Sequence, residues 1–285
     1  MHQKQKSQNV ILIDSMDGVL YASNWFISGQ DNFFLGRRNV FEVQQIDTVG
    51  SVLDSAWEAV QAGSLGIFDS MLASSQTAGR GQYRREWVSP EGNIYAALRL
   101  PQTDPFLGTE SAVALGAWIA SALCEMGYSA ALKWPNDVVV EIGGQYTKVC
   151  GILLESRNNV VMAGIGVNVS GSPDMSAMRE ATALPAGSLK AAALAQELPE
   201  PTVGKVWDLL LKQIYSFYTY RIGQVRGWKD HADRRMLWRD LPVTLVDGEE
   251  QVTGILREVG PKGELILETD GVSQAYLRGS IRFCG

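Results

Sequence analysis

A glycine- and arginine-rich segment at residues 76–87 is the first part of the sequence whose residue types indicate chemistry. It reads Gln-Thr-Ala-Gly-Arg-Gly-Gln-Tyr-Arg-Arg-Glu-Trp. Glycines allow backbone N–H groups to approach an anion closely, and guanidinium groups donate paired hydrogen bonds to phosphate or carboxylate oxygens. The segment lacks the Gly-Lys-Ser/Thr of a P-loop, so taken alone it also fits an exposed surface turn.

A second segment, Lys-Trp-Pro-Asn-Asp at residues 133–137, places polar side chains between two apolar runs. Pro135 restricts the chain and removes a backbone donor, which predicts a turn where Asn136 and Asp137 face a ligand. Lys148 lies in the next apolar run, although most strand lysines simply face solvent. Together the two segments predict an anion-binding site lined by cations, an amide and a carboxylate.

Histidine and cysteine are too few for several common kinds of site. The two histidines, His2 and His231, disfavour a multi-histidine metal site and a Ser-His-Asp triad. The three cysteines, Cys124, Cys150 and Cys284, form no Cys-x-x-Cys pair and are expected to be reduced thiols.

Charge and hydropathy restrict the partners. The 285 residues carry a formal net charge of -6, which gives no general attraction to nucleic acid or an anionic membrane. The longest apolar stretch, residues 112–124, is shorter than the roughly 18 residues of a spanning helix, and no export signal is evident. We therefore expect a cytoplasmic protein that binds neither DNA nor a membrane.

The elements that must position the two segments follow from apolar periodicity. Strands are predicted at residues 40–46, 67–74, 93–100, 131–134, 138–142, 146–155 and 160–169. Helices are predicted at residues 51–62, 109–127, 189–197 and 202–227. A hairpin around residues 157–159 favours a mostly antiparallel or mixed sheet backed by helices, an α+β fold. The polar stretch after Asn168, to about Ser188, is expected to be irregular.

Both ends of the chain differ from this middle part. Residues 9–13 and 19–27 predict a β-hairpin with its turn at residues 14–18, and no recognition helix for DNA precedes residue 42. After residue 241, short strands separated by turns at residues 247–248, 260–263 and 270–271 predict a small SH3-like β-barrel. The expected domains are therefore an N-terminal extension (1–39), a main domain (40–238) and a C-terminal domain (239–285).

From about residue 40 to its end, the chain resembles the biotin protein ligase family. The resemblance is carried by Gln-Thr-Ala-Gly-Arg-Gly (76–81), Trp-Val-Ser-Pro-Glu-Gly (87–92), Lys-Trp-Pro-Asn-Asp (133–137), Lys148 with Gly-Ile-Leu (151–153), Gly-Ile-Gly-Val-Asn (164–168) and, more weakly, Ala-Thr-Ala-Leu (181–184). It implies a class II synthetase-like catalytic domain and a reaction in two steps. Biotin and MgATP would give biotinyl-adenylate and pyrophosphate, and a lysine of a biotin carboxyl carrier domain would then attack the mixed anhydride.

The resemblance also implies a role for each site residue. Lys148 would contact the biotin carboxylate and the α-phosphate, Arg80 would bind the phosphate side of the adenylate, and Asp137 would orient the acceptor lysine. Expected contacts to biotin are Thr48, Gln76, Gly79, Arg80, Gly81, Lys148 and Gly151, and expected contacts to the nucleotide are Arg80, Trp87, Asn136, Lys148 and Asn168. The implied cofactors are ATP and Mg²⁺, with biotin as substrate. No metal ligand is indicated, and a homodimer stays an open alternative.

Three positions depart from the family's pattern. Where the family usually has Asp-Ser-Thr-Asn, residues 47–50 read Asp-Thr-Val-Gly, so Val49 and Gly50 offer no side-chain hydrogen bonds to a ureido group. Gln82 stands where the family commonly has an arginine. Arg278 stands where an acidic residue usually precedes the Ser-Ile-Arg of residues 280–282.

Two other functions compete with biotin ligation. Lipoate and octanoate ligases or transferases of the same superfamily typically carry an Arg-Arg…Gly-Gly-Gly…His pattern, but no histidine lies between His2 and His231. A non-catalytic ligand-binding relative would not be expected to retain Lys148, Arg80 and Asp137 together. Biotin ligation is therefore the preferred function, and Cys150 beside this site is expected to be an apolar wall residue rather than a nucleophile.

Overall fold

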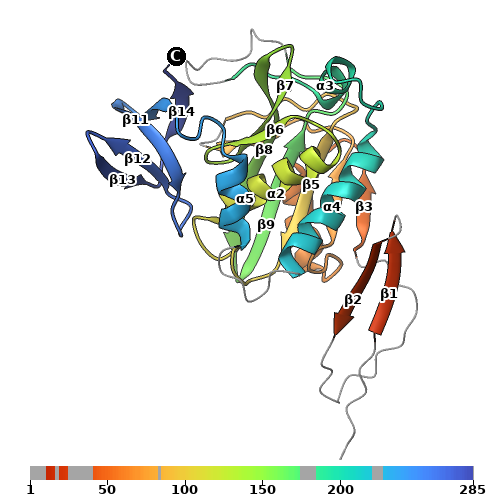
Figure 1. The fold of residues 1–285 in the computed structure, drawn as a ribbon. Helices are drawn as coiled ribbons and strands as arrows, with labels where there is room; N and C mark the ends of the chain where they lie inside the picture. Colours follow the sequence, from red (N-terminus) through yellow and green to blue (C-terminus); the bar gives the residue numbers. More distant parts are fainter. Residues whose placement is uncertain are drawn as a thin grey trace, which may run out of the picture. The chain divides into compact units, whose positions relative to one another are not determined.

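The computed structural model describes residues 11–16, 19–24, 41–82, 85–173, 184–219 and 227–284. The chain divides into two compact units, Met1–Val40 and Phe41–Gly285. In the first unit, β1 (Ile11–Met16) and β2 (Val19–Asn24) form an antiparallel hairpin (Figure 1). This confirms the predicted hairpin, but residues 14–16 belong to β1 rather than to the turn, because Met16 pairs with Val19.

The second unit is built on a seven-stranded sheet. In spatial order its strands are β3 (Val43–Ile46), β4 (Ser70–Ala73), β5 (Ile94–Leu100), β9 (Val160–Val167), β8 (Gln145–Arg157), β7 (Asp137–Ile142) and β6 (Ala130–Lys133). The β3–β4 pair is parallel and the other pairs are antiparallel. The predicted mixed, mostly antiparallel sheet is therefore confirmed.

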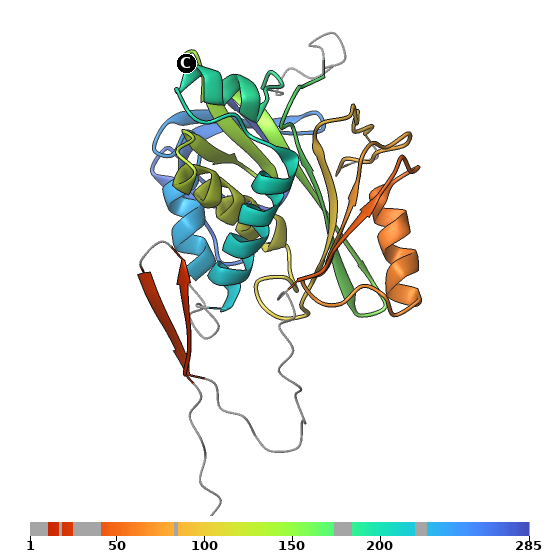
Figure 2. The same cartoon turned by 90° about the vertical axis from the view of Figure 1, so that its right-hand side faces the viewer.

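Helices cover both faces of this sheet. α1 (Val52–Gln61) lies on one face, while α2 (Ser111–Glu125) and α4 (Val203–Thr219) lie on the other (Figure 2). The short helix α3 (Leu189–Ala195) packs near β7. The apolar periodicity of α1 points its buried residues at the sheet, whereas α2 is buried nearly all round because α4 and α5 also pack against it.

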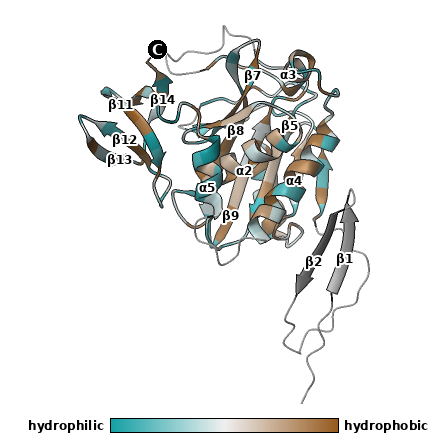
Figure 3. Ribbon diagram, viewed as in Figure 1, coloured by the Kyte–Doolittle hydropathy of each residue, from teal (hydrophilic) through white to brown (hydrophobic). Residues whose placement is uncertain are grey.

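The predicted helix at residues 202–227 is described as α4 up to Thr219, and residues 220–226 lie outside the described residues. A helix that was not predicted, α5 (Gly227–Arg235), packs against α2. α5 is largely hydrophilic (Figure 3), with Gly227, Trp228, His231 and Ala232 as its buried residues. Such a short apolar face carries too little periodic signal to be recognised in the sequence.

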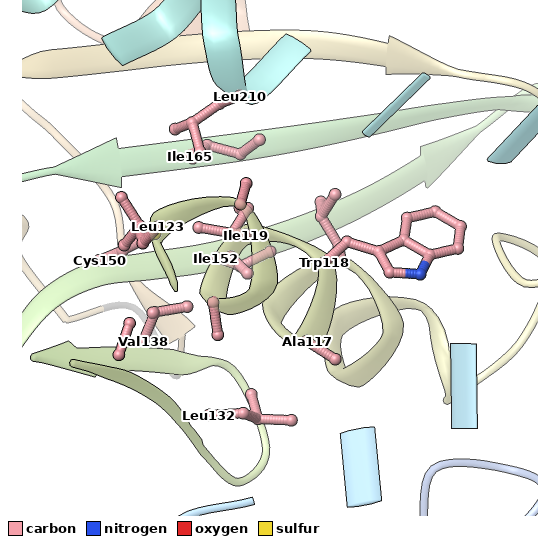
Figure 4. Packing of buried hydrophobic residues seen from close by; sticks show 14 of the residues in the cluster. Ala117, Trp118, Ile119, Leu123, Leu132, Val138, Cys150, Ile152, Ile165 and Leu210 are labelled. Carbon is pink, nitrogen blue, oxygen red and sulfur yellow. The ribbon is translucent and has the colours of Figure 1, made fainter. Parts of the chain in front are cut away.

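The main core lies between the sheet and α2. Its residues come from α2, from the helix-facing side of the strands and from α4 (Figure 4). Labelled members of this core are Ala117, Trp118, Ile119, Leu123, Leu132, Val138, Cys150, Ile152, Ile165 and Leu210. No described helix is both long enough and apolar enough to cross a membrane.

The C-terminal strands, predicted as a small SH3-like β-barrel, form a five-stranded antiparallel sheet. They are β10 (Pro242–Asp247), β11 (Glu250–Val259), β12 (Leu265–Thr269), β13 (Val272–Tyr276) and β14 (Ser280–Phe283), in the order β13-β12-β11-β10-β14. Trp134 Nε1 donates a hydrogen bond of 2.9 Å to the Gly263 carbonyl. The C-terminal sheet is thereby joined to the turn at residues 133–137.

Candidate active site

A cavity of about 620 Å³ opens on the α1 side of the large sheet, within the size range of small-molecule sites. Its walls come from the start of α1, from described residues of the 76–82 and 85–87 segments, from strands β7, β8 and β9, and from two turns of the C-terminal sheet. Eight residues expected from the sequence line it, namely Gln76, Arg80, Gly81, Trp87, Asn136, Asp137, Lys148 and Gly151. Segments far apart in the sequence therefore meet here.

Glycines form the floor of the cavity. Along β9, Ile165 and Val167 point into the helix-covered core, so Gly164 and Gly166 face the cavity. A Cβ atom at Gly166 would lie 2.5 Å from the Trp87 ring, and one at Gly151 would lie 2.6 Å from the same ring. The missing side chains therefore make the space that Trp87 occupies.

A β-bulge turns Lys148 toward this space. Val138 pairs with Cys150 but Val139 pairs with Lys148, so Val149 is an extra residue in β8. Without it, strand alternation would place Lys148 on the core side with Cys150; with it, Lys148 shares a face with Asp137. The Lys148 Nζ lies 2.6 Å from the Asp137 Oδ1, so these two site residues expected from the sequence are direct neighbours.

The Lys148 ammonium also lies over the cavity's aromatic wall. Its Nζ is 5.4 Å from the centre of the Trp87 ring, within cation–π range. The side chain of Lys148 is 28% exposed and that of Asp137 is 18% exposed. A partly desolvated cation of this kind interacts with a bound anion more strongly than a surface lysine does.

Arg80 is held by two carboxylates at the cavity wall. Its guanidinium donates to both oxygens of Asp54, at 2.6 and 2.9 Å, and to Glu155 at 3.3 Å. The hydrogen bond from Arg80 lowers the pKa of Asp54, against the raising effect of partial burial. Glu155 also accepts a hydrogen bond of 2.9 Å from Trp57 Nε1, so Glu155 anchors the group to α1.

Gln76 ties the glycine-rich segment to α1. Its Oε1 accepts a hydrogen bond of 2.9 Å from the Val52 backbone, and its Nε2 donates to the Ser89 hydroxyl at 3.0 Å. Gly79 does not line the cavity, and a Cβ atom there would lie only 2.4 Å from the Trp87 carbonyl oxygen. Glycine at this position thus permits close approach of two backbones instead of contacting the cavity.

Two more of the expected residues lie outside the cavity wall. The Thr48 hydroxyl is hydrogen-bonded to the Ser75 hydroxyl at 2.7 Å, and Thr48 does not line the cavity. Asn168 is buried, and its amide donates to the Gly187 carbonyl at 3.0 Å. These contacts hold neighbouring loops together. The weaker match at residues 181–184 lies outside the described residues except for Leu184.

Several wall residues were not predicted. They include Ser51, Val52 and Leu53 at the start of α1, and Asp247, Gly248, Gly279 and Ser280 from the C-terminal sheet. The buried Lys133 donates a hydrogen bond of 3.1 Å to the Ser280 hydroxyl, which links the two parts of the wall. The Ser-Ile-Arg segment at residues 280–282 was the one sequence feature that could have indicated a contribution from the C-terminal strands. Its position beside the cavity depends on how the two sheets pack, which the sequence does not show.

The thiol and phenol near the cavity are poor candidates for neutral-pH chemistry. Cys150 is fully buried in the core, and this burial strongly raises the pKa of its thiol. Burial also raises the pKa of Tyr95 to about 12. The cavity therefore offers cations, hydrogen-bond donors and a carboxylate. Cys150 belongs to the core and does not line the cavity, so the expectation that it is an apolar wall residue is wrong.

Three comparisons with known proteins bear on this chemistry. A model of the Biotin/lipoate A/B protein ligase family matches residues 58–172. The chain is 31% identical to the biotin--[acetyl-CoA-carboxylase] ligase of Paracoccus denitrificans over 75% of this chain and 90% of that protein. It is 28% identical to the bifunctional ligase/repressor BirA of Escherichia coli strain K12, over 77% of this chain and 67% of that protein. Its structure is similar to that of a biotin protein ligase from Aquifex aeolicus in complex with biotin and ATP, with a TM-score of 0.67 and 25% identity, covering 85% of this chain and 97% of that chain.

Proposed function

The chain belongs to the biotin/lipoate A/B protein ligase family, and from this premise we propose that it is a biotin protein ligase. It joins biotin to a lysine of a carrier domain at the expense of ATP. The name of the Paracoccus relative points to the carrier of an acetyl-CoA carboxylase as the acceptor. The observation that carries the proposal is the Lys148–Asp137 pair beside Arg80 in one glycine-floored cavity.

The first step joins biotin to the nucleotide. A carboxylate oxygen of biotin attacks the α-phosphorus of ATP, the bond from that phosphorus to the bridging oxygen breaks, and pyrophosphate leaves. Lys148 stabilises the negative charge shared by the carboxylate and the α-phosphate, because its ammonium lies in a partly desolvated wall. Arg80 binds the phosphate side once its guanidinium exchanges Asp54 for the ligand.

The second step transfers the biotinyl group. The acceptor amine attacks the carbonyl carbon of biotinyl-adenylate, the bond from that carbon to the phosphate oxygen breaks, and AMP leaves. Asp137 accepts a hydrogen bond from the incoming amine and so orients it. No enzyme nucleophile is needed, which agrees with the burial of Cys150.

The remaining contacts follow from the wall of the cavity. Gln76, Gly81 and Gly151 contact biotin, while Trp87 and Asn136 contact the adenylate. Thr48, Gly79 and Asn168 act indirectly, since each supports a loop without lining the cavity.

Magnesium is proposed to enter with ATP. In the described part of the chain, no group of three or more histidine, cysteine, aspartate or glutamate side chains is arranged to hold a metal ion. Mg²⁺ commonly binds through one or two carboxylates and substrate phosphates while keeping several waters. Asp137 and Asp247 of the cavity wall fit such a partial ligand set.

The proposed reaction is tested by transfer to an acceptor. The chain is incubated with biotin, MgATP and an apo-carrier domain, and the carrier is analysed by mass spectrometry. We expect one biotinyl group on the acceptor lysine and none on a lysine-to-arginine carrier. Modification by lipoate but not by biotin would contradict the proposal. Sedimentation of the same sample tests whether the enzyme is a homodimer.

A further inference from the structure

Ser51 is a buried serine at the N-terminus of α1. Its hydroxyl forms no hydrogen bond with another described residue. This serine is the N-cap residue of α1 and lines the cavity, and it is only 4% exposed. Its side chain makes no cap hydrogen bond, and its Oγ has no hydrogen-bond partner among the described residues. A buried hydroxyl without a partner requires an explanation, because nearly all such groups are hydrogen-bonded.

The Trp87 Nε1 atom has the same property in the same cavity. It is buried, and no described residue accepts its hydrogen bond. Trp87 lies over the glycine floor and packs against the core residues on the α1 side of the sheet. Two unsatisfied polar atoms in one wall indicate that the wall is complementary to a polar ligand.

Polar side-chain atoms at residues 48–50, just before Ser51, are either engaged in hydrogen bonds or absent. The Ser51 hydroxyl therefore stays available to the polar head group of a ligand. The Thr48 hydroxyl is engaged by Ser75, and Val49 and Gly50 carry no polar side-chain atoms. The Gln76 Oε1 is engaged by the Val52 backbone, directly after Ser51. Ser51 therefore offers a hydroxyl to the cavity two residues after Val49, which has none.

We propose that the Ser51 hydroxyl donates a hydrogen bond to the ureido carbonyl of biotin and thereby selects biotin over simple fatty acids. The proposal rests on the proposed function, since it assigns a residue to the biotin-binding part of the same cavity. The N-terminus of α1 adds partial positive charge beside the carbonyl oxygen. Octanoate and lipoate have no ureido group and gain nothing from this contact.

The experiment compares Ser51→Ala with Ser55→Ala, a serine one turn later on α1 that does not line the cavity. Biotin dissociation constants are measured by calorimetry, with thermal unfolding as a check on the fold. Ser51→Ala is expected to weaken biotin binding about tenfold, while Ser55→Ala and the wild type bind equally. Ser51→Thr, which keeps a hydroxyl, should recover most of the loss.

Binding of octanoate separates this proposal from the function on which it rests. Any residual octanoate affinity should be the same in the wild type and in Ser51→Ala. An unchanged biotin dissociation constant in a folded Ser51→Ala would overturn the role of Ser51 and leave biotin ligation intact. A wild type that binds no biotin would instead overturn the proposed function. If Ser51→Ala does not fold, Ser51→Gly, which an N-cap position tolerates, replaces it.

Discussion

The Lys148 ammonium and the Asp137 carboxylate lie 2.6 Å apart because a single extra residue, Val149, turns Lys148 out of the core. The cation proposed for the first step and the carboxylate proposed for the second are thus direct partners before a ligand binds. Binding of the biotin carboxylate must then compete with Asp137 for the same ammonium. The proposed groups for adenylate formation and for transfer to the acceptor amine therefore lie at the same point of the cavity wall.

Replacing Lys148 should stop the first half-reaction. Lys148→Ala removes the positive charge that stabilises the α-phosphate in the transition state. By analogy with removal of an oxyanion-hole donor, we expect the activation free energy to rise by about 2.7–4 kcal/mol, which slows the step roughly 100- to 1,000-fold. Biotin-dependent pyrophosphate exchange measures this step directly. Circular dichroism and thermal unfolding should show a folded protein, and wild-type exchange in this variant would exclude Lys148 from the chemistry.

The glycine floor should tolerate no side chain. In Gly166→Ala the new Cβ atom would lie 2.5 Å from the Trp87 ring, so the ring must move out of its place. We expect adenylate formation to fall at least tenfold, as a misplaced wall residue typically causes larger losses. Gly171→Ala is the matched control, because no heavy atom lies within 4 Å of a Cβ atom there. Equal activities in the two variants would show that the position of Trp87 is irrelevant.

Gln82 should make the enzyme retain its intermediate poorly. It lines the cavity at a position where the family commonly has arginine, and a charge-assisted hydrogen bond contributes about 1.5–3 kcal/mol, or roughly ten- to a hundredfold in retention. Biotinyl-adenylate should therefore escape and label lysines of an unrelated bystander protein. Gln82→Arg should reduce that labelling. Negligible labelling by the wild type, unchanged in the variant, would mean that other residues such as Arg85 retain the adenylate.

The Asp54–Arg80 pair should make a pH-dependent contribution to stability. The hydrogen bond from Arg80 lowers the pKa of Asp54 in the folded protein. The contribution of the ionised Asp54 to the free energy of unfolding is therefore complete above the ordinary aspartate pKa of about 3.9. It is lost as the pH falls through the lowered pKa of Asp54 in the folded protein. The Asp54 side chain is 53% exposed, so the difference between the wild type and Asp54→Asn should not exceed about 1 kcal/mol.

Urea unfolding at neutral and acidic pH measures this difference. The gap between the wild type and Asp54→Asn should narrow when the pH falls below about 4. Lys212 pairs with Asp208 on α4, away from the cavity wall, so Asp208→Asn serves as a control for an ordinary surface pair. A gap that stays constant with pH would show that the Arg80 contact does not stabilise the fold through the charge of Asp54.

Local patterns in the sequence were sufficient to predict the mixed sheet and the residues of the two main segments. Asp137 and Lys148 belong to distinctive local segments, and their strands pair with each other. The bulge at Val149 was not predictable, because Lys-Val-Cys reads as an ordinary alternating strand. The sequence signals an unusual lysine but not the face to which it points.

Contacts between distant segments account for most of what the sequence did not show. Glu155 holds Arg80 across 75 positions, and Asp247 reaches the cavity from the C-terminal sheet. Thr48 and Asn168 show a second limit: the resemblance to the family suggested ligand contact, whereas in the structure their side chains form hydrogen bonds to neighbouring loops. Motif position predicts proximity to the cavity, whereas side-chain direction depends on the packed structure.

Pyrophosphate exchange measured separately with biotin, lipoate and octanoate tests the central claim most directly. Each acid is supplied with MgATP, labelled pyrophosphate and the same enzyme preparation, and Lys148→Ala serves as the inactive control. The account predicts rapid exchange with biotin, little with lipoate or octanoate, and exchange with biotin at least about 100-fold slower in the variant. Exchange with lipoate or octanoate that exceeds exchange with biotin would contradict it, as would the absence of exchange with all three acids.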